Sequence, residues 1–263
     1  MSAARFSLKG RRALVTGASP GIGRAVAVAL AEHGAELILH HFGNAAGARE
    51  VAETIGGNTP VLEADFTDGQ ATQAFADAVA ERFGPVDILV ANAAIEHRRP
   101  WQELDRAHID AHVTSNFSAL LTLTAKLVPP MTERGWGRVV ATGSIMATRP
   151  RAETVVYAAL KAAQLTAVRA IAREVGHRGV TLNVVSPGAI ENKVNAERYR
   201  DPAFRAAVTA KIPVDRQGQP QDLVGAFVFL CSDAASYITG ADIPVDGGWS
   251  IGDAPGALPQ VAS

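Results

Sequence analysis

Two side chains that can move a proton stand four residues apart in this chain. Tyr157 and Lys161 lie in an alanine-rich stretch with helical spacing, and residues i and i+4 share one face of a helix. A free phenol has a pKa near ~10 and is a weak base at neutral pH, but a neighbouring cation favours the phenolate. The pair suits general acid–base chemistry at a carbonyl oxygen, although the same spacing also occurs by chance on solvated helix faces.

Two polar residues upstream strengthen this interpretation. Ser144 follows a strand predicted at residues 138–142, and open parallel sheets bind ligands at the carboxyl ends of their strands. Asn116 lies among apolar residues in a long helix predicted near residues 105–127. Because Asn is a mediocre helix former, its presence there predicts a role beyond helix formation.

A glycine-rich turn connects the first predicted strand, residues 12–16, to a helix at residues 21–32. Gly17, Gly21 and Gly23 permit a tight turn and allow a pyrophosphate to approach the backbone. The helix that follows offers free N–H groups and a positive dipole to phosphate. The spacing G-x-x-x-G-x-G differs from the common G-x-G-x-x-G, so the position of the turn carries more weight than its spacing.

Short apolar strands alternate with helices along the chain. The strands are apolar on both faces, which is typical of a parallel sheet covered by helices on both sides. This alternation predicts an α/β fold, a doubly wound Rossmann sheet of about seven strands in a single domain at residues 1–263, with a peripheral tail at 250–263. Further strands are expected at residues 36–40, 60–64, 87–91, 180–185 and 242–245, and further helices at 45–55, 70–83, 154–175, 202–211 and 220–231.

The bulk composition disfavours several classes of function. The net charge of -1 gives no electrostatic reason to bind nucleic acid or an anionic membrane. The single cysteine, Cys231, suits a reducing compartment, and no apolar stretch is expected to reach the ~20 residues of a membrane span. His108 and His112 lack neighbouring ligand residues and are expected on a solvated helix face. We expect a cytoplasmic protein without a metal site.

As a set, these motifs resemble those of the short-chain dehydrogenase/reductase family, and the likeness covers about residues 8–249. The motifs that carry it are the glycine turn at residues 17–23, Asn92-Ala93-Ala94, the tetrad Asn116, Ser144, Tyr157 and Lys161, Pro187-Gly188, and Val245-Asp246-Gly247-Gly248. Ala94 departs from the family's pattern, which has glycine at this position. The family often has Thr shortly after Pro-Gly, where this chain has Ala189-Ile190-Glu191-Asn192.

The resemblance implies an NAD(P)-dependent oxidoreductase that moves a hydride between nicotinamide and a carbonyl or secondary alcohol. Tyr157 would be the acid in reduction and the base in oxidation. Lys161 would hold the nicotinamide ribose and lower the phenol pKa, and Ser144 would hydrogen-bond the substrate oxygen. Asn116 would hold a water that links Lys161 to solvent. Further implied contacts are Asp65 with Phe66 at the adenine, Asn92 near its ribose and Ile190 at the carboxamide.

The end of the second predicted strand bears on the choice of cofactor. NAD enzymes usually carry an acid there, ~20 residues past the glycine turn, to hold the ribose hydroxyls. This chain has His40 and His41 instead, which could hydrogen-bond a 2′-phosphate, so NADP(H) is favoured and NAD(H) is the alternative. The full set of expected cofactor contacts is Gly17, Ser19, Gly21, Ile22, Gly23, His40, His41, Asp65, Phe66, Asn92, Ala93, Ala94, Tyr157, Lys161, Pro187, Gly188 and Ile190.

Polar segments at residues 96–99, 149–153 and 191–200 are expected to surround the cleft. They favour a small polar substrate, such as a sugar, polyol or keto acid, unless they form ordinary solvated surface. A ketoreductase similar to 3-oxoacyl-carrier-protein reductases is one alternative. A non-catalytic nucleotide-binding regulator is another, which the presence of both Tyr157 and Lys161 disfavours.

The helix at residues 154–175 carries alanines on several faces, and the helix before it is apolar over more than one face. Excess apolar surface of this kind usually marks an interface. Family members commonly pair these helices, and the last strand, across twofold axes. We therefore expect a homotetramer, or at least a dimer through the Tyr157 helix.

Overall fold

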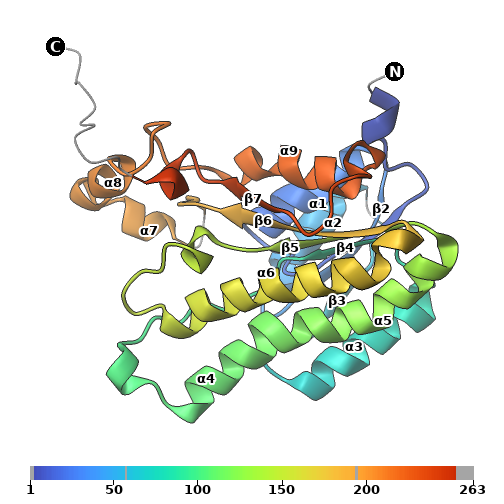
Figure 1. Cartoon of the computed structure of the whole chain (residues 1–263), viewed down its shortest axis with the longest axis horizontal. Coiled ribbons are helices and arrows are strands. Elements are labelled where there is room, and N and C mark those ends of the chain that lie inside the picture. The colour runs from blue at the N-terminus through green and yellow to red at the C-terminus, as the bar shows by residue number, and fades with distance from the viewer. Residues whose placement is uncertain (1–2, 57, 193–194, 253–263) are drawn as a thin grey trace.

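The computed structural model of the chain describes residues 3–56, 58–192 and 195–252. Its centre is a seven-stranded parallel sheet in the order β3-β2-β1-β4-β5-β6-β7 (Figure 1). The strands are β1 (Arg12–Val15), β2 (Glu36–His41), β3 (Val61–Glu63), β4 (Ile88–Ala91), β5 (Gly137–Thr142), β6 (Val180–Pro187) and β7 (Asp242–Val245). The strand order reverses between β1 and β4, which is where doubly wound sheets bind ligands. The predicted doubly wound α/β fold is confirmed.

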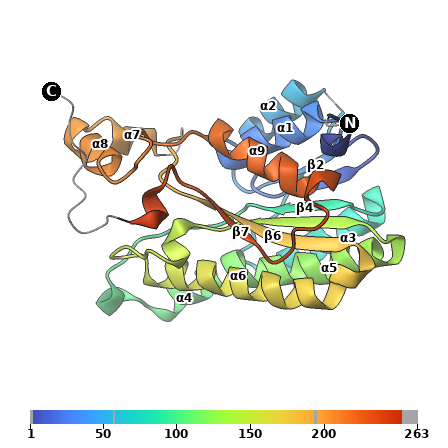
Figure 2. The same ribbon diagram turned by 45° about the horizontal axis from the view of Figure 1, so that its top comes forward.

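Helices cover both faces of the sheet (Figures 1 and 2). One face carries α1 (Ile22–Glu32), α2 (Ala45–Ile55) and α9 (Pro220–Cys231), and the other carries α3 (Gly69–Phe83), α5 (Ala119–Arg134) and α6 (Val155–Val175). Successive residues of β1 point to opposite faces, so Val15 joins the core beneath α1 while Leu14 joins the core above α3. Two buried apolar layers therefore fix the sheet and the strand ends that surround the site.

The long helix expected at residues 105–127 is divided into three parts. It consists of α4 (Arg106–Val113), a π-helical segment (Thr114–Ser118) and α5, which continues past Pro129 and Pro130 to Arg134. Prolines weaken a helix by removing N–H donors, but Val128 and Met131 are buried in the core and hold the last turn in place. The π-helical segment contains Asn116, and such segments are frequent at functional sites.

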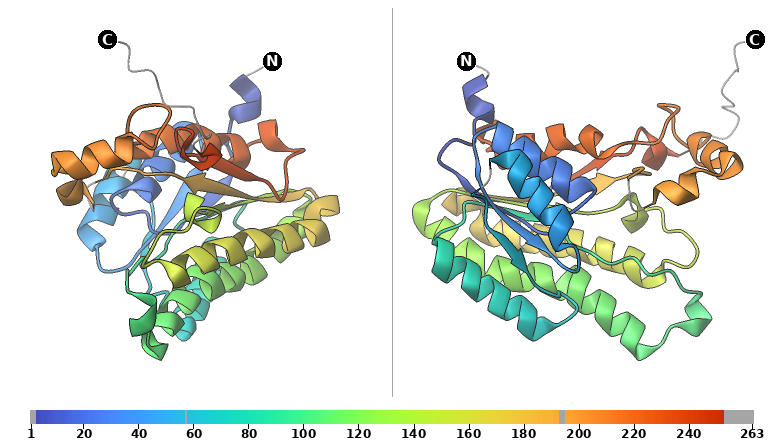
Figure 3. Two further views of the ribbon diagram at one scale, coloured as in Figure 1. Left: turned by 60° about the vertical axis from the view of Figure 1, so that its left-hand side comes forward. Right: turned by 180° about the vertical axis from the view of Figure 1, so that it is seen from behind.

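Two short helices, α7 (Ala196–Tyr199) and α8 (Pro202–Thr209), lie together at one end of the molecule (Figure 3). The sequence predicts only α8, and residues 193–194 of the expected polar segment lie outside the described residues. A final 3₁₀ turn, Trp249–Ile251, follows β7. The tail beyond residue 252 also lies outside the described residues.

One helix corrects an expectation about membrane spans. The segment Val155–Arg178, which contains α6, has 24 residues and a mean hydropathy of 1.3, so by length and composition it could cross a membrane. A helix that lies on the sheet of a globular core passes the same test. α6 packs on the sheet with Lys161 and Gln164 buried, which fits this second explanation.

Candidate active site

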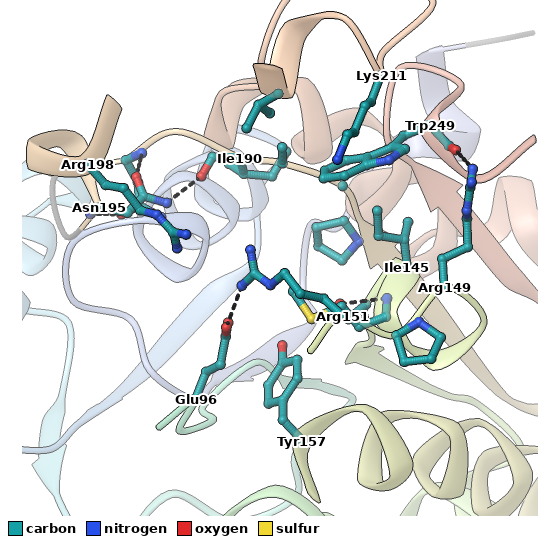
Figure 4. Close-up of a pocket in the computed structure, with 18 of the residues that line it drawn as sticks. Glu96, Ile145, Arg149, Arg151, Tyr157, Ile190, Asn195, Arg198, Lys211 and Trp249 are labelled. Atoms are coloured by element: carbon teal, nitrogen blue, oxygen red, sulfur yellow. Dashed lines mark hydrogen bonds and ion pairs between the residues drawn. The ribbon is translucent and has the colours of Figure 1, made fainter. Parts of the chain in front are cut away.

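A cavity of about 710 Å³ opens at the carboxyl ends of β5 and β6 (Figure 4). Ser144 follows β5, Gly188 follows β6, and both line this cavity. Tyr157 enters it from the first turn of α6, and Ile22 from the start of α1. The structure thus brings two of the four predicted catalytic residues together with predicted cofactor contacts in one space.

The phenol of Tyr157 is placed to donate a proton. It hydrogen-bonds the hydroxyl of Ser144, which in turn accepts the N–H of Met146 at 3.1 Å. Burial raises the pKa of Tyr157, as does the charge of Glu96, while the Ser144 hydrogen bond and the charge of Arg151 oppose that rise. The phenol is therefore protonated at neutral pH, which is the state required of a general acid.

Lys161 lies behind this pair. Its Nζ donates to the carbonyl oxygen of Thr142 at 2.6 Å and lies 5.5 Å from the centre of the Tyr157 ring. Burial lowers the pKa of Lys161 to about 8. The expectation that Lys161 lowers the phenol pKa is not met in this geometry, because desolvation dominates at both groups and the ammonium is directed at the end of β5.

Asn116 anchors the segment that follows β4. Its Oδ1 accepts the N–H of Ile95 and its Nδ2 donates to the carbonyl of Ile95, both at 2.8 Å. Its own backbone carbonyl accepts Nε2 of Gln164 at 2.5 Å. Gln164, which the sequence analysis missed, is buried, and its Oε1 has no hydrogen-bond partner among the described residues. The signal for it was a polar residue three positions after Lys161, on the same side of the helix.

The glycines of the turn are required for two different reasons, close packing and backbone conformation. A Cβ on Gly23 would lie 2.0 Å from the carbonyl oxygen of Gly17, and Gly21 precedes α1 with a φ of 116°, which L side chains rarely adopt. Nδ2 of Asn92 donates to the carbonyls of Thr16 at 3.0 Å and Gly17 at 3.1 Å. The partly buried start of α1 fits a pyrophosphate, and Asn92, which follows β4, holds the turn in place.

The other predicted contacts connect neighbouring strands. Oδ1 of Asn92 accepts the hydroxyl of Thr142, and the N–H of Ala93 donates to the hydroxyl of Thr16. Asp65, after β3, is partly exposed, with Oδ1 accepting two hydrogen bonds from Thr67. The predicted contacts that do not line the cavity are Gly17, Ser19, Gly21, Gly23, His40, His41, Asp65, Phe66, Asn92, Ala93, Ala94, Asn116 and Lys161.

His40 is placed differently from the expectation. Its side chain is buried, its Nδ1 accepts the N–H of Gly17 at 3.1 Å, and its Nε2 lies 3.0 Å from the carbonyl of Ala64. The ring stacks on Phe66 at 4.0 Å and contacts the edge of Phe75. Burial lowers the pKa of His40 to about 4. A neutral imidazole whose two nitrogens are both engaged does not bind phosphate. The prediction that His40 contacts the 2′-phosphate of the cofactor is therefore corrected.

Two further histidines are also more buried than the sequence suggests. His41 lies 3.8 Å from Oε1 of Glu63, and its Nδ1 has no hydrogen-bond partner in the described parts of the chain. His112, expected on a solvated face, is fully buried: its Nε2 accepts the N–H of His97 and its Nδ1 lies 2.8 Å from the carbonyl of His108. The ring of His112 therefore serves local structure, whereas contact between His41 and the cofactor stays a prediction.

The low pKa of His40 predicts acid sensitivity. Between its ordinary value of 6.5 and about 4, the unfolded chain binds a proton at this position and the native protein does not. The free energy of unfolding should therefore fall as pH falls through this window, by up to roughly 3 kcal/mol. Denaturant unfolding at pH 7 and pH 4 would measure this. His40→Asn keeps an acceptor for the N–H of Gly17 and cannot titrate. If the free energy of unfolding of this variant fell equally between pH 7 and pH 4, the acid sensitivity would not come from His40.

Several lining residues were not predicted individually. Met146, Tyr199, Phe204, Val208, Lys211 and Trp249 line the side of the cavity that faces α7, α8 and the final turn. The polar residues expected around the cleft are present, including Glu96, Arg151 and Arg198. No pattern in the sequence indicates that α8 and Trp249 contribute to the same cavity, because they lie about 40 residues apart and meet only in the fold.

Comparisons with known proteins agree with this geometry. The family described as Enoyl-(Acyl carrier protein) reductase matches residues 17–250. The chain is 36% identical over 246 residues to the 3-oxoacyl-[acyl-carrier-protein] reductase FabG of Salmonella typhimurium, covering 92% of this chain and 98% of that protein. A 3-oxoacyl (acyl-carrier-protein) reductase of Agrobacterium tumefaciens C58 with NADP bound is similar at a TM-score of 0.89 and 35% identity, covering 94% of this chain and 97% of that one.

A second solved structure has a different activity in its description. It is a gluconate 5-dehydrogenase from Burkholderia cenocepacia J2315 in complex with NADP and tartrate. The two chains are 29% identical with a TM-score of 0.88, and the match covers 96% of this chain and 100% of that one. Proteins of this fold and similarity therefore act on both acyl-carrier and sugar-acid substrates, so overall likeness does not select the substrate.

Proposed function

Because this chain belongs to the short-chain dehydrogenase/reductase family, we propose that it is an NADP(H)-dependent oxidoreductase that interconverts a carbonyl and a secondary alcohol on a small polar molecule. The observation that carries this proposal is that Ser144 and Tyr157 line the same cavity at the ends of β5 and β6. When bound, the nicotinamide supplies or accepts the hydride. The protein's part is to bind, to orient and to handle the proton.

Each predicted catalytic residue has a role that its position supports. In reduction, Tyr157 gives its proton to the carbonyl oxygen, while Ser144 hydrogen-bonds the same oxygen as charge develops on it. In oxidation, the phenolate takes the proton back. Lys161, held behind Tyr157 by Thr142, binds the nicotinamide ribose. Asn116 and Gln164 together offer a polar site for the water that links Lys161 to solvent, since Oε1 of Gln164 is a buried acceptor without a partner among the described residues.

The polar lining of the cavity supports a sugar, a polyol or a keto acid as the substrate class. A 3-oxoacyl-carrier-protein reductase is the second candidate, supported by the similarity to FabG and by basic residues at the cavity mouth. A panel of ketones, sugars, polyols and keto acids, run with each cofactor while nicotinamide absorbance is followed, tests the proposal. Turnover of no small molecule, with turnover of an acyl-carrier thioester, would favour the second candidate.

The choice of cofactor gives a direct prediction. The only carboxylate of β2, Glu36, lies at its far end and pairs with Arg12 at 3.0 Å, so β2 itself supplies no acid for the ribose hydroxyls. Glu63, at the end of β3, accepts the N–H of Gly43 at 3.1 Å and lies 3.8 Å from His41. The two similar structures described above hold NADP. We expect fluorescence titration to give a lower Kd for NADPH than for NADH. Tighter binding of NADH would contradict this and would indicate that Glu63, at the end of β3, accepts from the ribose.

The assembly is proposed from exposed apolar surface. On α6, Val155 is half-exposed, and the alanines at positions 159 and 170 are exposed, although this helix packs on the sheet. We expect a homotetramer, or at least a dimer through α6, located in the cytoplasm. Light scattering at micromolar concentration should give a multiple of the 27.5 kDa chain mass. A monomer mass would rule this assembly out.

A further inference from the structure

Basic side chains line the cavity on several sides. Five of them line it, against a single carboxylate, Glu96, among the lining residues that the structure describes: Arg98, Arg149, Arg151, Arg198 and Lys211. Figure 4 shows the guanidinium of Arg151 extending across the cavity, above the hydroxyl of Tyr157 and between Glu96 and Arg198. The excess positive charge therefore lies beside the phenol.

Glu96 cannot neutralise this cluster. Its Oε1 accepts both Nε of Arg98 at 3.0 Å and a terminal nitrogen of Arg151 at 3.1 Å, so one negative charge serves two guanidinium groups. Nε of Arg151 is buried and has no hydrogen-bond partner among the described residues. Burial first, and then the charges of Arg98 and Arg198, lower the pKa of Arg151, which reflects this local excess of positive charge.

Basic residues nearby that point away from the cavity are neutralised within their own segment. Arg200 pairs with Glu197 at 2.5 Å, and Arg205 forms a two-pronged pair with Glu191 at 2.7 and 2.8 Å. Arg198 lies between Glu197 and Arg200 in the chain. It has no ion pair with any residue that the structure describes and instead lies over the ring of Phe204. Among the basic residues that line the cavity, Arg98 and Arg151 share one carboxylate and Arg198 has none among the described residues, and an ordinary solvated surface does not explain this shortage of carboxylates.

We infer that the substrate is an anion, a small hydroxy acid or keto acid whose carboxylate is bound by Arg151 and Arg198 while its carbonyl or alcohol carbon faces Tyr157. This inference rests on the proposed function and specifies its substrate class. Guanidinium groups match the planar geometry of a carboxylate and bind it with paired, charge-assisted hydrogen bonds. Because Arg151 lies next to the phenol, the carboxylate is close to the reacting carbon, which favours a compact molecule over a long acyl chain.

The cofactor phosphates do not account for the cluster. The phosphate site predicted from the glycine turn lies at the start of α1, where a Cβ on Gly21 would meet no atom closer than 3.9 Å. Arg151 instead acts electrostatically on Tyr157 and Glu96, and it precedes α6 in the chain. The two explanations differ in one measurable way, since a phosphate-binding arginine would change the Kd of the cofactor.

The test uses matched compounds that differ only in charge, such as a keto acid and its amide, with the intact protein and NADPH. Arg151→Met keeps the aliphatic stem of the side chain and removes the guanidinium. We expect kcat/KM for the acid to fall by ~10- to 100-fold in Arg151→Met and in Arg198→Gln, with the amide changed by less than ~3-fold. Arg200→Gln is the control, because that guanidinium lies in the same segment, pairs with Glu197 and does not line the cavity.

Calorimetric titration of the keto acid into the protein with NADP(H) gives a second readout that needs no turnover. A ~10-fold weaker Kd in Arg151→Met, with an unchanged cofactor Kd, supports the inference. Three results would each overturn the inference. They are a wild-type kcat/KM for the amide that equals or exceeds that for the acid, turnover of acyl-carrier thioesters alone, and loss of cofactor affinity in Arg151→Met. If neither compound reacts but the acid binds through Arg151, the proposed reaction fails while the anion site stands.

Discussion

Tyr157→Phe should lower kcat by ~10²- to 10⁴-fold, the usual contribution of a general acid or base, while the cofactor Kd stays within about twofold of the wild type. The ring remains in place, so packing and nicotinamide binding are preserved and only the proton donor is lost. Burial holds the phenol pKa above its ordinary value, so Tyr157 is the protonated group beside the substrate oxygen at neutral pH. Steady-state kinetics and a cofactor titration measure the two effects separately.

Tyr237→Phe is the matched control for this experiment, because that phenol is fully exposed and lies outside the cavity. It should retain wild-type kcat and KM. Turnover near the wild-type rate in Tyr157→Phe would remove Tyr157 from the reaction. In that case Ser144, which hydrogen-bonds Tyr157, would be the next candidate for a donor.

Lys161→Ala is expected to weaken cofactor binding and to slow turnover. It should raise the cofactor Kd by ~10- to 100-fold, because a charge-assisted hydrogen bond to the ribose is lost, and it should lower kcat as well. The pKa of Lys161 near 8 adds a pH signature. The wild-type affinity for cofactor should fall as pH rises through about 8 and the ammonium loses its proton, whereas the variant should show no such step.

The control for this variant is Lys126→Ala, since that lysine lies on α5 and pairs with Asp77 at 2.5 Å, away from the cavity. Lys161 is buried, so thermal unfolding of the variant should be checked alongside the titration. A cofactor Kd equal to that of the wild type in folded Lys161→Ala would remove the ribose role. A loss of kcat alone would then assign Lys161 to proton handling only.

Most strands and helices could be predicted because their signals are local. Each buried strand is a short apolar run bounded by turn residues, and α2, α9 and β7 begin and end at the expected residues. Helix ends were less certain where two preferences compete. The helix expected to end at residue 127 continues through Pro129 and Pro130 to Arg134, because the buried side chains of Val128 and Met131 hold its last turn on the core.

The environment of a side chain was harder to predict than its position in the chain. His40 stands where a phosphate ligand was expected, yet Phe66 and Phe75 cover it and Gly17 occupies its acceptor nitrogen. Those contacts come from β3, α3 and the glycine turn, which are distant in sequence. The tetrad was easier to find, because its residues follow strand ends or share a helix face and thus depend on local geometry.

The charge balance of the cavity also could not be predicted from composition. The polar segments on either side of the site contain both acidic and basic residues, and only the structure shows which of them pair. Arg205 is neutralised by Glu191, while Arg198 in the same segment faces the cavity. The distinction between solvated surface and substrate site therefore depends on pairing, which no single-sequence pattern encodes.

The most direct test of the central claim follows the transferred hydrogen. The protein is incubated with NADPH that carries two deuterium atoms at C4 of the nicotinamide, and with the keto acid that the panel identifies as its best substrate. The account predicts an alcohol product with one deuterium on its carbinol carbon, detected by mass spectrometry, and loss of this product in Tyr157→Phe. An unlabelled alcohol, or no reduction of any carbonyl compound with either cofactor, would contradict it.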